Sequence, residues 1–70
     1  MPECYIIWDT YKRKPWVSNR GRATWTSPRY AVLSWESSEG KRFNGRAGRY
    51  QVHSASIVRG MLVDSEEYVG

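Results

Sequence analysis

The sequence has very few residues that could cross-link the chain or bind a metal ion: one cysteine, Cys4, and one histidine, His53. A disulfide framework needs cysteine pairs, and a structural zinc site usually needs roughly four Cys or His ligands, so the chain supports neither. The longest apolar stretch, Tyr5–Trp8, is much shorter than the roughly 20 residues that cross a membrane as a helix. A secretory signal has a basic start followed by an apolar segment. The sequence has no such pattern, so no secretory signal is expected. With a lone free thiol, these absences favour a cytoplasmic protein with no metal, no cofactor and no membrane partner.

The short chain limits the size of the core that it can bury. Its 70 residues suffice for one small domain, 1–70. Folding at this size buries only about 60% of the surface that the unfolded chain exposes. Hydrophobic residues make up 40% of the sequence and aromatic residues 14%, so a wholly disordered chain is not expected. A homodimer would enlarge this small core.

The charges are unevenly distributed along the chain. Residues 11–50 carry ten of the eleven basic residues and two acidic ones, a net charge of +8, whereas residues 1–10 and 51–70 each carry −2. Eight of the eleven bases are arginine, whose planar guanidinium pairs with phosphate or carboxylate and stacks on rings. The basic block is either a solubilising surface or a face that binds an anionic partner, and we favour the second interpretation.

Segments rich in aromatic and β-branched residues predict the first strands. Cys4–Trp8 is predicted as a strand covered on both faces, and Trp16–Ser18 as the second arm of a hairpin. The basic turn between them ends at Pro15, which lacks an N–H. Residues 19–22 are predicted as a tip, because Asn and Gly tolerate positive φ, and residues 23–26 continue as strand.

The middle of the chain admits two interpretations. Ser27-Pro28 is typical of a helix start, with serine as the N-cap and proline at the first helical position. We therefore expect at least one helix within residues 27–46, with a second start at Ser37 or Ser38. In the competing interpretation, residues 30–35 form a strand and residues 37–40 a hairpin turn.

The last part of the chain predicts one more strand and an unstructured end. Residues 50–53 open the strand, further core residues follow at 57–63 across a kink near Gly60, and residues 64–70 form a frayed acidic tail. The predicted fold class is α+β. We expect a small single-layer antiparallel sheet of about three to four strands, with one helix packed on it, in the order β-β-α-β.

Three segments carry a resemblance to known proteins: the start Tyr5–Thr10, the step Trp16–Gly21 and the closing Tyr50–Val52. In this order of strand, basic turn, second strand with a Gly-rich tip, helix and last strand, the chain resembles small bacteriophage and prophage orphan proteins. The resemblance implies that the protein is encoded by a mobile element and is located in the cytoplasm of the host cell. It also implies a non-enzymatic protein that binds and blocks a host factor, such as one used in defence.

No combination of residues predicts catalysis. Cys4 and His53 are the only thiol–imidazole pair, and each lies in a predicted strand, where a buried thiol and a histidine with satisfied ring nitrogens are ordinary. The carboxylates of Glu36, Glu39 and residues 64–67 are expected to be solvated. We therefore predict no catalytic residue and no enzymatic activity.

Two turns that contain glycine and arginine are candidates for anion binding. In residues 19–23 and 44–49, glycine allows successive N–H groups to converge on an anion, and arginine adds charge-assisted hydrogen bonds. Neither turn has the P-loop spacing, so no nucleoside triphosphate hydrolysis follows. Plain turns on a basic surface would have the same composition.

Aromatic residues alternate with bases through the basic block, as in single-stranded nucleic-acid binders, where rings stack on bases and cations hold phosphates. Five rings are expected in the core: Tyr5, Trp8, Trp25, Trp35 and Tyr50. The predicted binding residues are Lys12, Arg13, Lys14, Arg20, Arg22, Arg46 and Arg49, with Tyr11, Trp16 and Tyr30 as exposed rings.

The predicted function is that of a small binding protein whose basic, aromatic-rich face engages nucleic acid or a nucleotide-like ligand. The alternative is a phage-type inhibitor that blocks a host protein with an acidic surface through Trp, Tyr and Arg side chains.

Overall fold

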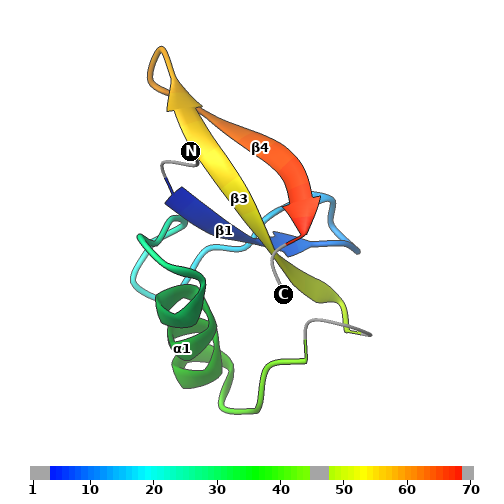
Figure 1. The fold of residues 1–70 in the computed structure, drawn as a ribbon. Helices are drawn as coiled ribbons and strands as arrows, with labels where there is room; N and C mark the ends of the chain where they lie inside the picture. The colour runs from blue at the N-terminus through cyan, green and yellow to red at the C-terminus, as the bar shows by residue number, and fades with distance from the viewer. Residues whose placement is uncertain (1–3, 45–47, 69–70) are drawn as a thin grey trace.

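In the described part of the chain, the fold consists of one helix and four antiparallel strands (Figure 1). The computed structural model describes residues 4–44 and 48–68, with the side chains of residues 66–68 left undescribed. In chain order the elements are β1 (Cys4–Asp9), β2 (Lys14–Pro15), α1 (Pro28–Glu39), β3 (Tyr50–Val58) and β4 (Met61–Tyr68). The strand order in the sheet is β2-β1-β3-β4. The α+β fold class predicted from the sequence is confirmed.

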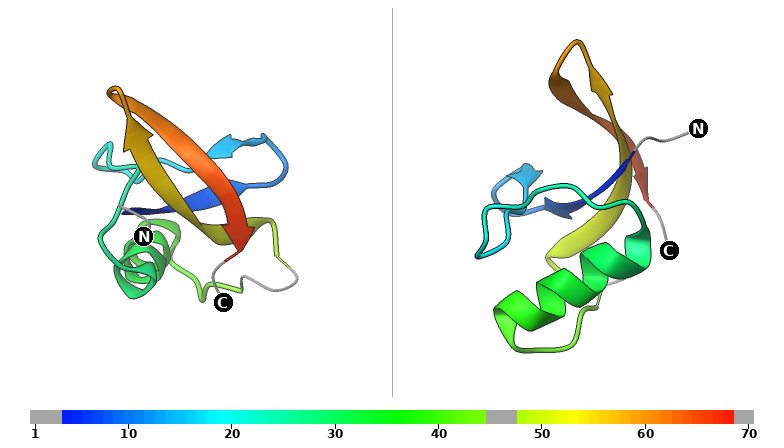
Figure 2. Two further views of the ribbon diagram at one scale, coloured as in Figure 1. Left: turned by 45° about the horizontal axis from the view of Figure 1, so that its top comes forward. Right: turned by 90° about the vertical axis from the view of Figure 1, so that its left-hand side faces the viewer.

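The sheet is built around the pairing of β1 with β3, from Cys4 opposite Ala55 to Asp9 opposite Tyr50. The edge strand β2 has only two residues, and beyond it the backbone N–H of Trp16 still donates to the carbonyl of Ile7 at 2.7 Å. At the other edge, β4 follows β3 through a turn at Arg59 and Gly60, both with positive φ. The β3–β4 hairpin is long and curled, and its tip projects away from α1 in both views of Figure 2.

Helix α1 begins and ends where its capping residues allow. The Ser27 side chain accepts a hydrogen bond from the backbone N–H of Tyr30, and Pro28 occupies the first turn. Gly40, at φ 70°, ends the helix and donates its N–H to the carbonyl of Glu36. The helical interpretation of this segment is therefore correct. The strand over residues 30–35 and the second helix start at Ser37 or Ser38 are not observed.

The sheet has a packed core on each face. On the face covered by α1, the buried residues are Ile7, Trp25, Ala31, Trp35 and Val52. On the opposite face, Cys4, Ile6 and Ala55 are buried, with Trp8 and Leu62 packed against them. Because β1 is covered on both sides, its Tyr5–Trp8 run shows no alternation between apolar and polar residues.

Several finer expectations differ from the structure. Residues 23–26 are not a strand; they contribute one isolated bridge, in which Trp25 and Tyr5 exchange backbone hydrogen bonds of 2.8 and 2.9 Å. The segment expected to fray from residue 64 belongs to β4 as far as Tyr68, because it pairs with β3 across a register shift near His53. A fifth element thus extends the expected β-β-α-β order.

The single thiol is expected to react slowly in the native protein. Cys4 is 7% exposed, and its Sγ donates a weak hydrogen bond to the carbonyl of Ala55 at 3.6 Å. A reagent reaches such a group only when the sheet opens. Alkylation by iodoacetamide should be slow in buffer and fast in denaturant, as followed by mass spectrometry. Rapid stoichiometric labelling in buffer would contradict this packing of β1.

Candidate anion-binding surface

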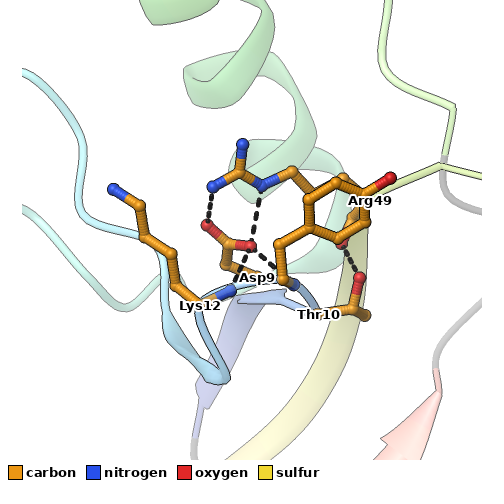
Figure 3. Close-up of polar contacts among 5 residues, drawn as sticks. Asp9, Thr10, Lys12 and Arg49 are labelled. Atoms are coloured by element: carbon orange, nitrogen blue, oxygen red, sulfur yellow. Dashed lines mark hydrogen bonds and ion pairs between the residues drawn. The ribbon is translucent and has the colours of Figure 1, made fainter.

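A buried carboxylate organises the end of the sheet where β1 meets β3. Asp9 is only 3% exposed, and both of its oxygens accept from Arg49, at 2.9 Å from Nε to Oδ1 and 2.9 Å from the terminal nitrogen to Oδ2 (Figure 3). Its Oδ1 also accepts from the backbone N–H groups of Tyr11 and Lys12. In return, the carbonyl of Arg49 accepts from the backbone and the hydroxyl of Thr10, at 2.9 and 2.6 Å. This cluster fixes the turn that follows β1.

The hydrogen bonds of the cluster stabilise the ionised carboxylate of Asp9 and the charged guanidinium of Arg49. Hydrogen bonding to Arg49 and to two backbone N–H groups lowers the pKa of Asp9 to about 2, although burial alone would raise it. Hydrogen bonding to Asp9 raises the pKa of Arg49, whose guanidinium lies 5.0 Å from the Tyr11 ring centre and 5.3 Å from that of Tyr50. Burial raises the pKa of Tyr50. The charge of Arg49, predicted from the sequence to bind an external anion, is therefore already compensated inside the fold.

Two neighbouring grooves hold most of the remaining predicted cations. The first, of about 440 Å³, lies between the β1–β2 turn and the end of α1; it is lined by Lys12, Lys14, Trp16, Val17, Glu39 and Arg49 among others. The second, of about 510 Å³, lies between residues 18–25 and α1; it is lined by Ser18, Asn19, Arg20, Arg22, Trp25, Tyr30, Ser34, Ser37 and Ser38. A hydrogen bond from Ser38 to Asn19 ties the end of α1 to the second groove. We call the two grooves together the basic surface.

The structure separates some of the residues that the sequence grouped. Arg13, at φ 56°, lines a different hollow with Trp8, His53 and Asp64, on the sheet face opposite α1. Trp16 is partly buried and stacks on Trp25, so it is not a fully exposed platform. Arg46 lies outside the described residues.

Two of the predicted rings are well exposed. Tyr30 is 59% exposed beside Arg20 and Arg22, which matches the ring-and-cation arrangement expected there. Tyr11 is 77% exposed, but Arg49 covers one of its faces. Tyr30 is therefore the ring of the basic surface that is most open to a ligand.

The second groove also contains three serine hydroxyl groups that were not predicted from the sequence. Ser34, Ser37 and Ser38 stand three and four positions apart on α1, a spacing that places them on one helix face. Once the helix is accepted, this spacing would have revealed them. The hydroxyl of Ser38 donates to Asn19, so Ser34 and Ser37 add hydroxyl donors to a groove whose charge comes from Arg20 and Arg22.

The single histidine is held within the sheet. His53 is buried, its Nδ1 lies 3.0 Å from Asp64 Oδ2, and its Nε2 lies 3.1 Å from Gln51 Oε1. Its ring also stacks on Trp8 at 5.9 Å. These contacts tie β4 to β3 across the register shift, which is a structural role.

No helix in the described part of the chain is both long and apolar enough to cross a membrane. Within residues 4–44 and 48–68, no group of three His, Cys, Asp or Glu side chains is placed to hold a metal ion. Comparison of the chain with protein-family models, with curated proteins and with solved structures found no match. Its function therefore has to be inferred from its own residues.

Proposed function

We propose that this protein is a non-enzymatic binding protein that engages nucleic acid through the basic surface. The observation that supports the proposal is the state of the cations: among the described residues, Arg49 alone of the Lys and Arg side chains forms an ion pair with a carboxylate. Arg20 and Arg22 are exposed, and they share a groove with the open ring of Tyr30 and three helix hydroxyls. Cations beside a stacking ring and hydroxyl donors form the chemistry that holds a phosphate backbone with unstacked bases.

The salt dependence of binding tests this proposal. Binding of a fluorescently labelled oligonucleotide, measured by anisotropy over a range of NaCl concentrations, is expected to weaken linearly on a log–log plot. Each phosphate contact contributes about −0.7 to the slope for a single strand and about −0.9 for a duplex. Undetectable binding at low salt, or a slope near zero, would contradict the proposal.

A second candidate function is favoured by the tip of the β3–β4 hairpin. Ile57, Val58, Met61 and Val63 are each about half exposed or more, with Met61 at 71%. Adjacent exposed apolar side chains are typical of surfaces that contact another protein. A phage-type inhibitor would bind its host protein through this tip. In an affinity capture from a host lysate, nuclease treatment should then leave the amount of captured host protein unchanged. If nuclease treatment removed all of the captured protein, the inhibitor function would be contradicted and only the nucleic-acid proposal would remain.

A further inference from the structure

The second groove of the basic surface has two walls of different chemistry. One wall is the loop of residues 18–22, which carries the exposed side chains of Arg20 and Arg22. The other wall is α1, which contributes one ring and three hydroxyl groups: Tyr30, Ser34, Ser37 and Ser38. The volume of about 510 Å³ lies within the range of about 300–1,000 Å³ that is typical of ligand pockets. The groove is therefore large enough for a unit such as a nucleotide.

The arginine wall is fixed by hydrogen bonds within the loop. The oxygen of the buried Ser18 hydroxyl accepts from the backbone N–H groups of Arg20 at 3.3 Å and Arg22 at 3.1 Å. The backbone N–H of Ser18 donates to the carbonyl of Arg22 at 2.8 Å, which closes the loop. Arg22 Nε donates to the carbonyl of Thr24 at 2.8 Å, which orients the guanidinium. Neither arginine forms an ion pair with a described carboxylate, so both charges are available to a ligand.

The helix wall presents its ring and hydroxyls in one row. Tyr30, Ser34 and Ser37 stand at positions i, i+4 and i+7, and four positions correspond to about 6 Å along a helix axis. The hydroxyl of Ser38 donates to Asn19 at 3.3 Å and ties the two walls together. Tyr30 is 59% exposed, Ser37 is exposed and Ser34 is half-buried. A ligand that stacks on the ring therefore reaches the two remaining hydroxyls with its next group.

The two walls suit different parts of a nucleotide. A phosphate oxygen only accepts hydrogen bonds, and the guanidinium groups of Arg20 and Arg22 only donate them. A serine hydroxyl can both donate and accept, and so can the 2′-hydroxyl of ribose. Because the sugar joins the phosphate to the base, a strand with its phosphates on the arginines and a base on Tyr30 places its sugar near Ser34 and Ser37.

We infer that the second groove binds single-stranded RNA, with a base stacked on Tyr30 and the ribose 2′-hydroxyl hydrogen-bonded to Ser34 or Ser37. This inference rests on the proposed function and narrows it from nucleic acid in general to RNA. Deoxyribose has no hydroxyl at this position, so a DNA strand keeps the stacking and the charge contacts but loses this hydrogen bond. A duplex is disfavoured because its bases are paired and stacked inside, where Tyr30 cannot stack on them.

Strands that differ only at the 2′ position provide the test. The single strands U10 and dU10 carry the same bases and phosphates, and their affinities are measured by fluorescence anisotropy at low salt. The wild-type protein should bind U10 about fivefold more tightly than dU10, the effect of one hydrogen bond. A 2′-fluoro U10 strand keeps the sugar pucker of RNA without the hydroxyl, and it should bind like dU10. A GC-rich RNA duplex of ten base pairs should bind more weakly than U10.

Variants of the helix wall identify the residues responsible. Ser34→Ala/Ser37→Ala should lower the affinity for U10 to that for dU10 and leave dU10 binding unchanged; alanine favours the helix, so α1 is kept. Ser56→Ala removes a hydroxyl from β3, outside both grooves, and should change neither affinity. Tyr30→Ala should weaken the binding of both strands by about tenfold, because a stacked base is lost in each.

The outcomes separate this inference from the proposed function. If U10 and dU10 bind equally tightly with a salt-dependent affinity, the RNA assignment is wrong and the proposed function stands. The assignment is also overturned if the 2′-fluoro strand binds like U10, or if Ser34→Ala/Ser37→Ala weakens both strands equally, since the hydroxyls then do not contact the 2′-hydroxyl. Equal binding of the duplex and U10 would overturn the single-strand assignment. If no nucleic acid binds at low salt, both the proposed function and this inference fail.

Discussion

Replacing Asp9 by alanine is expected to destabilise the protein by about 2 kcal/mol, because the charged hydrogen bonds around this carboxylate disappear together. The variant removes both bonds from Arg49 and the acceptor that holds the backbone N–H groups of Tyr11 and Lys12. For a domain of this size the midpoint of thermal unfolding should fall by roughly 10 °C. Circular dichroism melting of the two proteins at pH 7 measures the difference.

The same carboxylate predicts a pH dependence of stability. The fold lowers the pKa of Asp9 from 3.8 to about 2, so the folded state favours the ionised form. This stabilisation is fully present above about pH 4 and is lost as the pH falls through 2, where the carboxyl takes up a proton in both states. In urea titrations, the difference between wild type and Asp9→Ala should therefore shrink on the acid side.

A matched variant identifies the cause. Glu39→Ala removes an exposed carboxylate of the same charge and should change the unfolding free energy by no more than about 0.5 kcal/mol. Equal effects of Asp9→Ala and Glu39→Ala, or a difference that does not change with pH, would show that the ion pair with Arg49 does not stabilise the turn.

The double variant Arg20→Gln/Arg22→Gln is expected to weaken single-strand binding by roughly 10- to 100-fold at low salt, because it removes two charge-assisted hydrogen bonds to phosphate. Both side chains are exposed and line the groove that contains Tyr30. The slope of log affinity against log salt should become shallower by about 0.7 for each phosphate that is no longer neutralised. Anisotropy titrations at several salt concentrations give both quantities.

The control for Arg20→Gln/Arg22→Gln is a double variant with the same net charge and a similar stability. Arg29→Gln/Arg59→Asn removes the same charge from two exposed sites that line neither groove of the basic surface, so binding should change little. The thermal midpoint of each double variant should stay close to that of the wild type, because exposed charges contribute little to stability. If the two double variants weaken binding equally, the contribution of Arg20 and Arg22 is bulk charge and the groove has no special role.

The parts of the fold that were predictable are those specified by neighbouring residues. Ser27 and Pro28 mark the helix start through a local hydrogen bond and a fixed φ. The run at β1 marks a strand because its residues are apolar on both faces. In the second groove, the arginines and Tyr30 were among the residues predicted from the sequence. The hydroxyl groups that α1 contributes to the same groove were not predicted.

The parts that were not predictable depend on pairing between distant residues. Asp9 and Arg49 lie 40 positions apart, and nothing near either residue in the sequence indicates that they form an ion pair. The net charge alone does not show which charged side chains are buried. Similarly, Lys12, Arg13 and Lys14 are consecutive, but the positive φ of Arg13 sends its side chain to another hollow. β4 was missed because its acidic residues suggested a tail, whereas its pairing with β3 is what orders it.

The central position of β1 in the sheet has a consequence for the order in which the chain folds. Helix α1 and the β3–β4 hairpin are closed by contacts between near neighbours, whereas β1 pairs with a strand whose residues follow as much as 51 positions later, as Cys4 does with Ala55 (Figure 1). Contacts of such long separation form slowly, because the intervening loop must be ordered first. We therefore expect β1 to pair with β3 only after α1 and the β3–β4 hairpin have formed. Interactions that hold its end, including the one at Asp9, then act mainly by slowing unfolding and contribute little to the speed of folding.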